Sequence, residues 1–334
     1  MGIADAVTKK YLQDNEVFSD VFNYRLFNGK PVIRPENLSE MDPSEILVLS
    51  GKKQNGKRKR LPAKSLYRDL MKDTVIRRDQ NAVYRLRLGT ELQTHVHYAM
   101  PVRNQLYDAI EYYNQMEETA LRHRAERSER NGAGGNAGAF LSGFRKEDRL
   151  IPVFTLTIHF GPEPWDGPLS LHDMMEVRDP EVMKYIPDYQ VQLIEPAGLS
   201  RTELEKFRSS FREVMGCIKY SEDEKALEEF MKDNPRMNMD IRAARVIGAM
   251  TGTEIEYGEE KEGKINMCKA IEDMMRHSKE KGLAEGQKEE RATRLDSFAR
   301  QVKVGKMRAE DVAEGFGIPV EQVNAAVAKI DGSL

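Results

Sequence analysis

Several features are scarce in this chain of 334 residues, and each scarcity argues against a class of protein. There are only two cysteines, Cys217 and Cys268, far apart and without neighbouring metal ligands, which argues against a disulfide framework or a zinc ribbon. No segment reaches the ~18 consecutive apolar residues of a membrane-spanning helix, and the amino-terminal stretch lacks the apolar region of a secretory signal. We therefore expect a reduced, cytoplasmic protein that does not enter a membrane.

An excess of positive charge is also lacking. The chain has 52 Lys and Arg against 55 Asp and Glu, a net charge of -3, so any attraction to nucleic acid has to come from a local basic cluster. The densest cluster is 51–60 (GKKQNGKRKR), which we interpret as a glycine-punctuated loop. We predict that its later residues contact DNA phosphates; the alternative is an ordinary solvated loop. These residues are Lys57, Arg58, Lys59 and Arg60.

The first 200 residues combine both kinds of periodicity. Apolar residues recur at helical spacing in two segments, and alternating or continuous apolar patterns mark the strands. We predict helices over 4–27 and 101–127 and strands over 66–77, 83–93, 151–161 and 189–194. The small and glycine-rich segment 128–149 is predicted to be a flexible loop.

Beyond residue 200 the patterns are almost entirely helical. We predict helices over 201–217, 222–233, 238–251 and 263–304, followed by two short helices. The predicted organisation is an α/β core over 1–200, a helical extension over 201–304 and a small helix-turn-helix-like tail over 305–334. The long helix is interpreted as a dimer contact or a solvated spacer, and the tail as a packing or oligomerisation appendage or a DNA reader.

Two neighbouring strands carry a candidate metal site. Period-two alternation places Glu91 and Gln93 on one face of the second strand, and Asp69 lies in the strand before it. Pairing of the two strands as a hairpin brings the carboxylates together. Mg²⁺ held by one or two carboxylates can activate water and relieve phosphate charge during phosphodiester hydrolysis. The alternative is that these acidic residues are simply solvated.

Longer stretches around these residues resemble a known family. YRDLMKD (67–73), LGTELQT (88–94) and YAMPVRNQLYDAIEYYNQ (98–115) follow one another in the order and spacing of the PD-(D/E)XK nuclease family of recombination-promoting nucleases, also labelled transposases. FSDVFNYRLFNGKPVI resembles the opening helix of that family, and DRLIPVFTLTIHFGPEPWDGPLSLHDM its next strand and tryptophan turn. The resemblance covers roughly 14–195 and continues loosely beyond.

The resemblance implies a restriction-endonuclease-like α/β core, a mixed central sheet flanked by helices, and DNA as the partner. It implies that Asp69 and Glu91 bind Mg²⁺, with Mn²⁺ or Ca²⁺ as substitutes, and that Gln93 assists catalysis. Because Asp69 and Glu91 lie farther apart than in the family, Asp73 is a rival first ligand. Asp20 is an accessory acidic candidate, for which Glu16 and Asp14 compete.

Three further residues have more than one interpretation. His95 and His97 would share a face with Glu91 if the strand continued, which would make a transition-metal site; otherwise they are exposed histidines at a strand end. Arg103 follows a proline at a helix start, where it would bind a DNA phosphate or pair with Glu91 or Asp108.

The sequence therefore predicts a Mg²⁺-dependent DNA endonuclease linked to recombination, mobile elements or defence. The alternative is a catalytically inactive nuclease-fold protein that binds DNA or another protein. A true transposase would need a different carboxylate triad, of which the sequence gives no clear sign.

Overall fold

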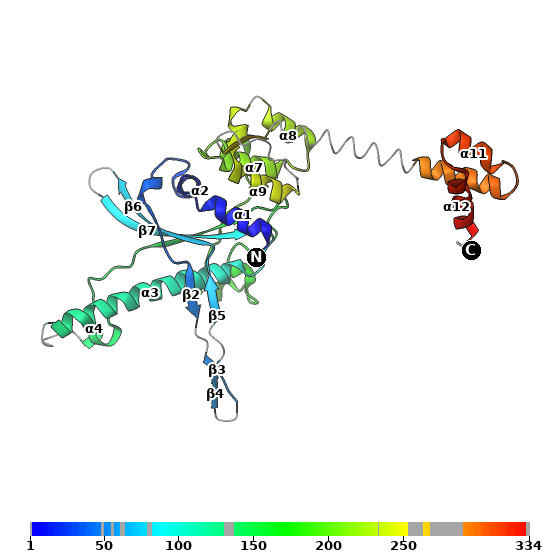
Figure 1. Cartoon of the computed structure of the whole chain (residues 1–334). Helices are drawn as coiled ribbons and strands as arrows, with labels where there is room; N and C mark the ends of the chain where they lie inside the picture. Colours follow the sequence, from blue (N-terminus) through cyan, green and yellow to red (C-terminus); the bar gives the residue numbers. More distant parts are fainter. Residues whose placement is uncertain are drawn as a thin grey trace. The chain divides into compact units, whose positions relative to one another are not determined.

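The computed structural model describes residues 2–47, 50–54, 57–60, 64–78, 82–129, 137–232, 234–252, 263–267 and 290–331 (Figure 1). The chain divides into two compact units, Met1–Cys268 and Lys269–Leu334. Across the described ranges, no helix combines the length and the apolar character needed to cross a bilayer.

The first unit is built on a five-stranded mixed sheet in the order β1-β6-β7-β8-β9. β1 pairs with β6 and β6 with β7 in antiparallel fashion, whereas β7 with β8 and β8 with β9 are parallel. The prediction of a mixed central sheet with flanking helices is thus confirmed. The strands are β1 (Leu38–Glu40), β6 (Leu70–Arg78), β7 (Ala82–Gln93), β8 (Val153–His159) and β9 (Gln192–Ile194).

The alternation read from 83–93 forms β7, and its polar face is buried toward the carboxyl end of the strand, although Arg85 on the same face is exposed. Leu88 is buried on one side, while Arg87 and Glu91 on the other side are also buried. The helix α3 (Met100–Glu129), which connects β7 to the parallel strand β8, supplies Glu111 as an ion-pair partner for Arg87. Buried charges of this kind need partners, so this face of β7 carries a paired polar network.

The predicted helix over 4–27 is two helices, α1 (Ile3–Leu12) and α2 (Asn15–Phe27). The single-helix prediction was wrong because Asp14 has extended backbone angles and acts as the N-cap of α2. Its Oδ1 accepts hydrogen bonds from the backbone N–H of Glu16 at 2.8 Å and of Val17 at 3.4 Å.

The basic segment interpreted as a loop contains two strands. β3 (Ser50–Gln54) pairs with β4 (Lys57–Arg60), and β2 (Ser44–Leu47) pairs with β5 (Lys64–Tyr67) (Figure 1). Two backbone hydrogen bonds, from Met41 N to Met71 O at 2.9 Å and from Arg68 N to Pro43 O at 3.1 Å, connect this pairing to that of β1 with β6. The loop prediction was wrong because strand pairing organises this backbone despite its glycines and charges.

The predicted glycine-rich loop is also partly ordered. Residues 137–142 form the helix α4 (Ala137–Ser142), while 130–136 lie outside the described residues. His123 Nδ1 of α3 donates a hydrogen bond to the Gly143 carbonyl at 3.1 Å, and its Nε2 lies 3.4 Å from Asp148 Oδ1. These contacts hold the segment after α4 against α3.

The helices after residue 200 pack on the N-terminal helices. Asp20 of α2 accepts hydrogen bonds from the backbone N–H of Arg208 at 2.9 Å and of Ser209 at 2.8 Å, and Tyr11 of α1 bonds Ser210 at 2.8 Å. The predicted helix over 201–217 is interrupted at this turn. The elements are α5 (Pro180–Met183), α6 (Arg201–Leu204), α7 (Phe211–Lys219), α8 (Glu224–Met231) and α9 (Ile241–Thr251).

Two short segments predicted as helix are strands instead. β10 (Asn238–Asp240) pairs with β11 (Lys264–Asn266). Asp240 then caps α9, its Oδ1 accepting a hydrogen bond from Arg242 N at 2.7 Å. The described residues of the unit also include the 3-10 turns η1 (Pro35–Asn37), η3 (His172–Met174) and η4 (Pro235–Met237).

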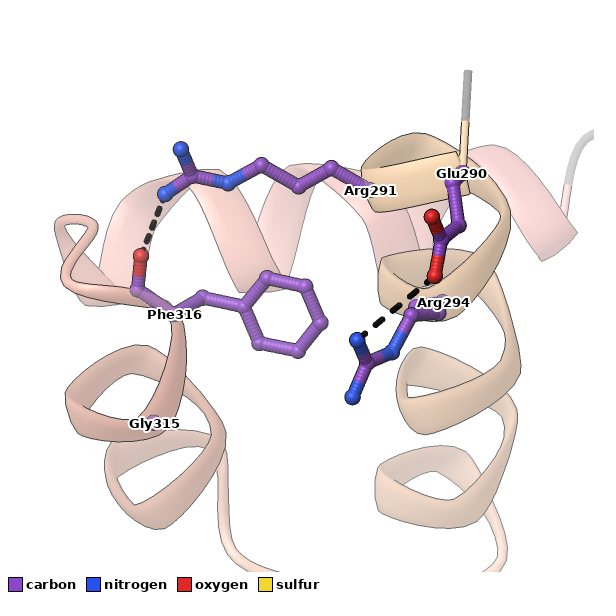
Figure 2. A pocket seen from close by; sticks show the side chains of 5 residues that line it. All are labelled: Glu290, Arg291, Arg294, Gly315 and Phe316. Atoms are coloured by element: carbon purple, nitrogen blue, oxygen red, sulfur yellow. Dashed lines mark hydrogen bonds and ion pairs between the residues drawn. The ribbon is translucent and has the colours of Figure 1, made fainter. Parts of the chain in front are cut away.

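The second unit contains a helix over 290–303, α11 (Ala309–Phe316) and α12 (Val320–Asp331). Gly317 ends α11 with a positive φ of 60°, which matches the predicted turn. In Figure 2, Phe316 lies opposite the helix over 290–303, and Arg291 of that helix donates to the Phe316 carbonyl. The middle of the predicted long helix, 268–289, lies outside the described residues.

Candidate active site

The predicted catalytic residues adjoin one pocket at the carboxyl end of β7. The pocket has a volume of about 330 Å³. Its walls come from α1, from the residue before β6, from the end of β7 and the turn after it, and from the first turn of α3. The polar residues that line it are Asp5, Asp69, Gln93, Thr94, His95, His97 and Arg103.

Asp69 is fixed to the strand that carries Glu91. Its backbone N–H donates to the Thr90 carbonyl at 3.2 Å, and its Oδ2 accepts a hydrogen bond from Leu92 N at 2.7 Å. These two bonds attach Asp69 to the residues on either side of Glu91. The hairpin pairing predicted from the sequence is therefore confirmed, and it brings the two carboxylate-bearing residues together.

Burial raises the pKa of Asp69 above its ordinary value. The bond from Leu92 and the charges of Lys9 and Arg103 act in the opposite direction, but they do not cancel the cost of burying the charged form. A carboxyl group with a raised pKa is a common feature of catalytic sites, although buried structural networks also produce it.

Glu91 is fully buried behind the pocket and pairs with Arg103. The distance from Arg103 Nη2 to Glu91 Oε2 is 3.0 Å, and Arg103 Nε donates to the hydroxyl of Tyr107 at 3.2 Å. Burial lowers the pKa of Arg103, but Glu91 and Tyr107 raise it by more. The predicted ion pair between Arg103 and Glu91 is confirmed, and the guanidinium remains positively charged.

Asp5 is a pocket residue that the sequence did not suggest. It lies in the first turn of α1, and its Oδ1 accepts a hydrogen bond from the Thr94 hydroxyl at 3.4 Å. Its charge also contributes to the raised pKa of Asp69. Because acidic residues are ordinary in the first turn of a helix, the sequence contained no signal for this role.

The histidine pair lines the pocket without extending the strand, because β7 ends at Gln93. His97 Nδ1 accepts a hydrogen bond from Ala99 N at 3.3 Å, so the proton of the neutral ring is on Nε2. Burial and the nearby Arg103 lower the pKa of His97 and favour this neutral form. In this form His97 carries a proton on Nε2, so binding of a transition metal at that atom would require loss of the proton.

The rival acidic residues have other partners. Asp73 of β6 pairs with Arg85, and its Oδ2 lies 3.8 Å from Arg87 Nε. Asp20 is buried and bonded to the turn before α7, as described above. Asp14 caps α2, and Glu16 is exposed on that helix. None of these four residues lines the pocket.

The predicted DNA-contacting residues lie in two different elements of the first unit. Arg103 is at the pocket, whereas Lys57, Arg58, Lys59 and Arg60 make up the strand β4. Three of them have cross-strand partners in β3, Lys57 opposite Gln54, Arg58 opposite Lys53 and Arg60 opposite Ser50. The backbone thus gathers the basic residues of both strands into one hairpin.

The donor chemistry of the pocket suits a hard divalent cation. Asp5 and Asp69 offer carboxylate oxygens, Gln93 offers an amide oxygen, and Glu91 lies directly behind them; Mg²⁺ prefers oxygen donors of these kinds. Within the described ranges, however, no three His, Cys, Asp or Glu side chains are already grouped closely enough to hold a metal. Binding would require Glu91 to exchange its contact with Arg103 for the cation.

Comparisons with known proteins add no assignment, because no protein-family model, no curated protein and no solved structure matches this chain.

Proposed function

We propose that this protein is a Mg²⁺-dependent DNA endonuclease with a PD-(D/E)XK-type core. The observation that carries the proposal is the attachment of Asp69, through its backbone and its carboxylate, to the strand residues flanking Glu91, with Gln93 lining the same pocket. This arrangement is what the resemblance to the recombination-promoting nucleases implies for the two metal ligands and the assisting glutamine.

The chain connectivity supports the same proposal. Antiparallel strands β1, β6 and β7 lead into α3, which returns to the parallel strand β8. A restriction-endonuclease-like core has a mixed sheet of this kind flanked by helices. The pocket lies where β7 passes into the segment leading to α3. Asp69 comes from the residue before β6, Asp5 from α1 and Arg103 from α3.

The chemistry would be hydrolysis of a phosphodiester. The oxygen of a water molecule bonds to phosphorus, one bond from phosphorus to a sugar oxygen breaks, and the proton released by the water is balanced by the proton taken up by the leaving oxygen. Bound Mg²⁺ would acidify the water and offset charge on the phosphate. Asp69 and Glu91 would hold the cation, and Gln93 would orient the water or a phosphate oxygen.

DNA as the substrate is supported by the basic hairpin. β3 and β4 together contain Lys52, Lys53, Lys57, Arg58, Lys59 and Arg60. Clustered cations gain affinity for DNA by releasing condensed counterions, and this affinity falls as salt rises. The basic hairpin would bind the DNA backbone, and the acidic pocket in the same unit would bind the metal.

Plasmid cleavage tests the proposal. Wild type is compared with Glu91→Gln and Asp69→Asn in Mg²⁺, Mn²⁺ or Ca²⁺, and Glu118→Gln, an exposed acid on α3, serves as the control. A metal ligand contributes several kcal/mol to the transition state, so each site variant should lose roughly 100-fold or more in rate, while the control keeps its rate. Equal cleavage by all variants would show a contaminant or a different site.

One observation favours the alternative of an inactive nuclease-fold protein that binds DNA. The ion pair between Glu91 and Arg103 already neutralises the buried carboxylate. If Glu91 stays paired with Arg103, no metal binds there and added metal leaves the melting temperature of wild type unchanged. A metal that binds only the folded protein must raise the melting temperature. Thermal shifts of wild type and Glu91→Gln with and without Mn²⁺ therefore separate the two functions.

A further inference from the structure

The pocket has a deficit of positive charge for an anionic substrate. Asp5 and Asp69 line it and Glu91 lies behind it, whereas its one lining guanidinium, Arg103, is paired with Glu91. Gln93 contributes no charge. With Mg²⁺ bound, its two positive charges and the one of Arg103 only balance the charges of Asp5, Asp69 and Glu91. A phosphodiester carries a further negative charge that increases on its oxygens as water attacks, so binding in this pocket calls for another cation.

Lys9 is placed to supply that cation. It follows Asp5 by four residues in α1, and residues so spaced lie on the same face of a helix, one turn apart. Asp5 lines the pocket and bonds Thr94, so this face of α1 is directed toward the end of β7. Lys9 does not itself line the pocket, so its long side chain would have to extend one helical turn to reach it from the position of Asp5.

The backbone that carries Lys9 is held firmly. Tyr11 and Leu12 of α1 are buried, as is Thr8, and the Tyr11 hydroxyl bonds Ser210 at 2.8 Å. A lysine on such a helix needs to order only its own side chain on binding an anion.

Lys9 is also available. Its side chain is half-buried, and no carboxylate or carbonyl in the described part of the chain accepts a hydrogen bond or ion pair from its ammonium group. Lys72 shows the contrast: its Nζ lies within 2.7 Å of Gln13 O, Asn15 Oδ1 and Glu40 Oε1.

We propose that Lys9 binds a non-bridging oxygen of the phosphodiester in this pocket, on the α1 side, while Arg103 faces it from the α3 side; this rests on the proposed nuclease function. Lys9 thereby provides the positive charge that Gln93 does not. The two cations come from different helices, so docking of α1 and α3 at the end of β7 creates the phosphate site.

The test compares Lys9→Gln and Lys9→Arg with Lys10→Gln. Lys10 is the next residue, exposed and on a different face of α1, which makes it the matched control. Binding of a short DNA duplex is measured in EDTA over a series of salt concentrations. Lys9→Gln should weaken binding and reduce the slope of log affinity against log salt by about one, whereas Lys9→Arg and Lys10→Gln should leave the slope unchanged.

Cleavage provides a second readout. Lys9→Gln should lower kcat/KM by roughly 10–100-fold, and adding Gln93→Lys to it should restore part of this loss by supplying charge from β7. If wild type binds and cleaves DNA, and Lys9→Gln binds and cleaves it as well as Lys10→Gln does, the Lys9 assignment alone is overturned. Wild type that neither binds nor cleaves DNA would overturn the nuclease proposal and this assignment together.

Discussion

At Gly89 of β7 a single added methyl group should be strongly destabilising. A Cβ built there would lie 2.3 Å from Arg68 Nη1, 3.4 Å from Arg68 Cδ and 3.2 Å from Thr155 Oγ1. The guanidinium is the far end of a flexible side chain, but it has no free space, because Arg68 is fully buried. Gly89→Ala must therefore displace Arg68 from its contacts.

The loss in the free energy of unfolding that we expect for Gly89→Ala follows from the contacts that Arg68 would lose. Arg68 donates to Thr155 Oγ1 at 2.5 Å and to Asp108 Oδ1 at 3.1 Å, and its guanidinium lies 5.3 Å from the Tyr107 ring centroid. Breaking a buried ion pair costs about 3–5 kcal/mol. Alanine recovers about 0.5–1 kcal/mol of the backbone entropy cost of a strand glycine. A net loss of about 3 kcal/mol corresponds to a fall in Tm of roughly 6–12 °C.

The assay is thermal and denaturant unfolding of four proteins: wild type, Gly89→Ala, Arg68→Met and the double variant. Arg68→Met alone should also destabilise, because it leaves the Asp108 carboxylate without its guanidinium partner. In that background the methyl group meets no guanidinium, so Gly89→Ala should cost almost nothing. The expected coupling between the two substitutions is therefore about 3 kcal/mol.

Two results would refute this reasoning. The first is a Gly89→Ala protein that melts within about 2 °C of wild type, since that is less than 1 kcal/mol. The second is a Gly89→Ala cost that is the same with and without Arg68, which would locate the damage elsewhere in the sheet.

Three further outcomes are expected. Because burial raises the Asp69 pKa, its charge destabilises the fold increasingly as pH rises; Asp69→Asn should melt above wild type at neutral pH, and the gap should shrink toward the ordinary carboxyl range near ~4. Gly216→Ala in α7 should lower Tm despite better helix propensity, because its Cβ would meet the Phe230 ring at 2.1 Å. Asp20→Ala should cost about 1–3 kcal/mol in denaturant unfolding, because it removes the acceptor of two part-buried backbone N–H groups.

Local periodicity was sufficient for two of the elements that carry the site. The predicted single strand over 66–77 was wrong, because the chain passes from β5 to β6 there and Asp69 lies between the two strands. The alternation of leucines with polar residues in 83–93 determined β7, and with it the shared face of Glu91 and Gln93. The helical spacing of 101–127 determined α3 in the same way. Patterns of period 2 and 3.6 are properties of neighbouring residues, so they can be read without a fold. A single capping side chain, Asp14, was enough to change one predicted helix into two.

Tertiary structure alone decided the surroundings of those residues. The polar face of β7 became a buried network because α3 covers it, and Glu91 obtained Arg103 as a partner by that packing. Asp5 joined the pocket, and Asp20 was excluded from it, according to where α1 and α2 dock. Such contacts join residues tens of positions apart in the sequence. Their energies depend on burial and on the distance between partners, and neither can be read from the residues next to them in the chain. The carboxylates could therefore be named from the sequence, whereas the charge balance that decides what binds them required the fold.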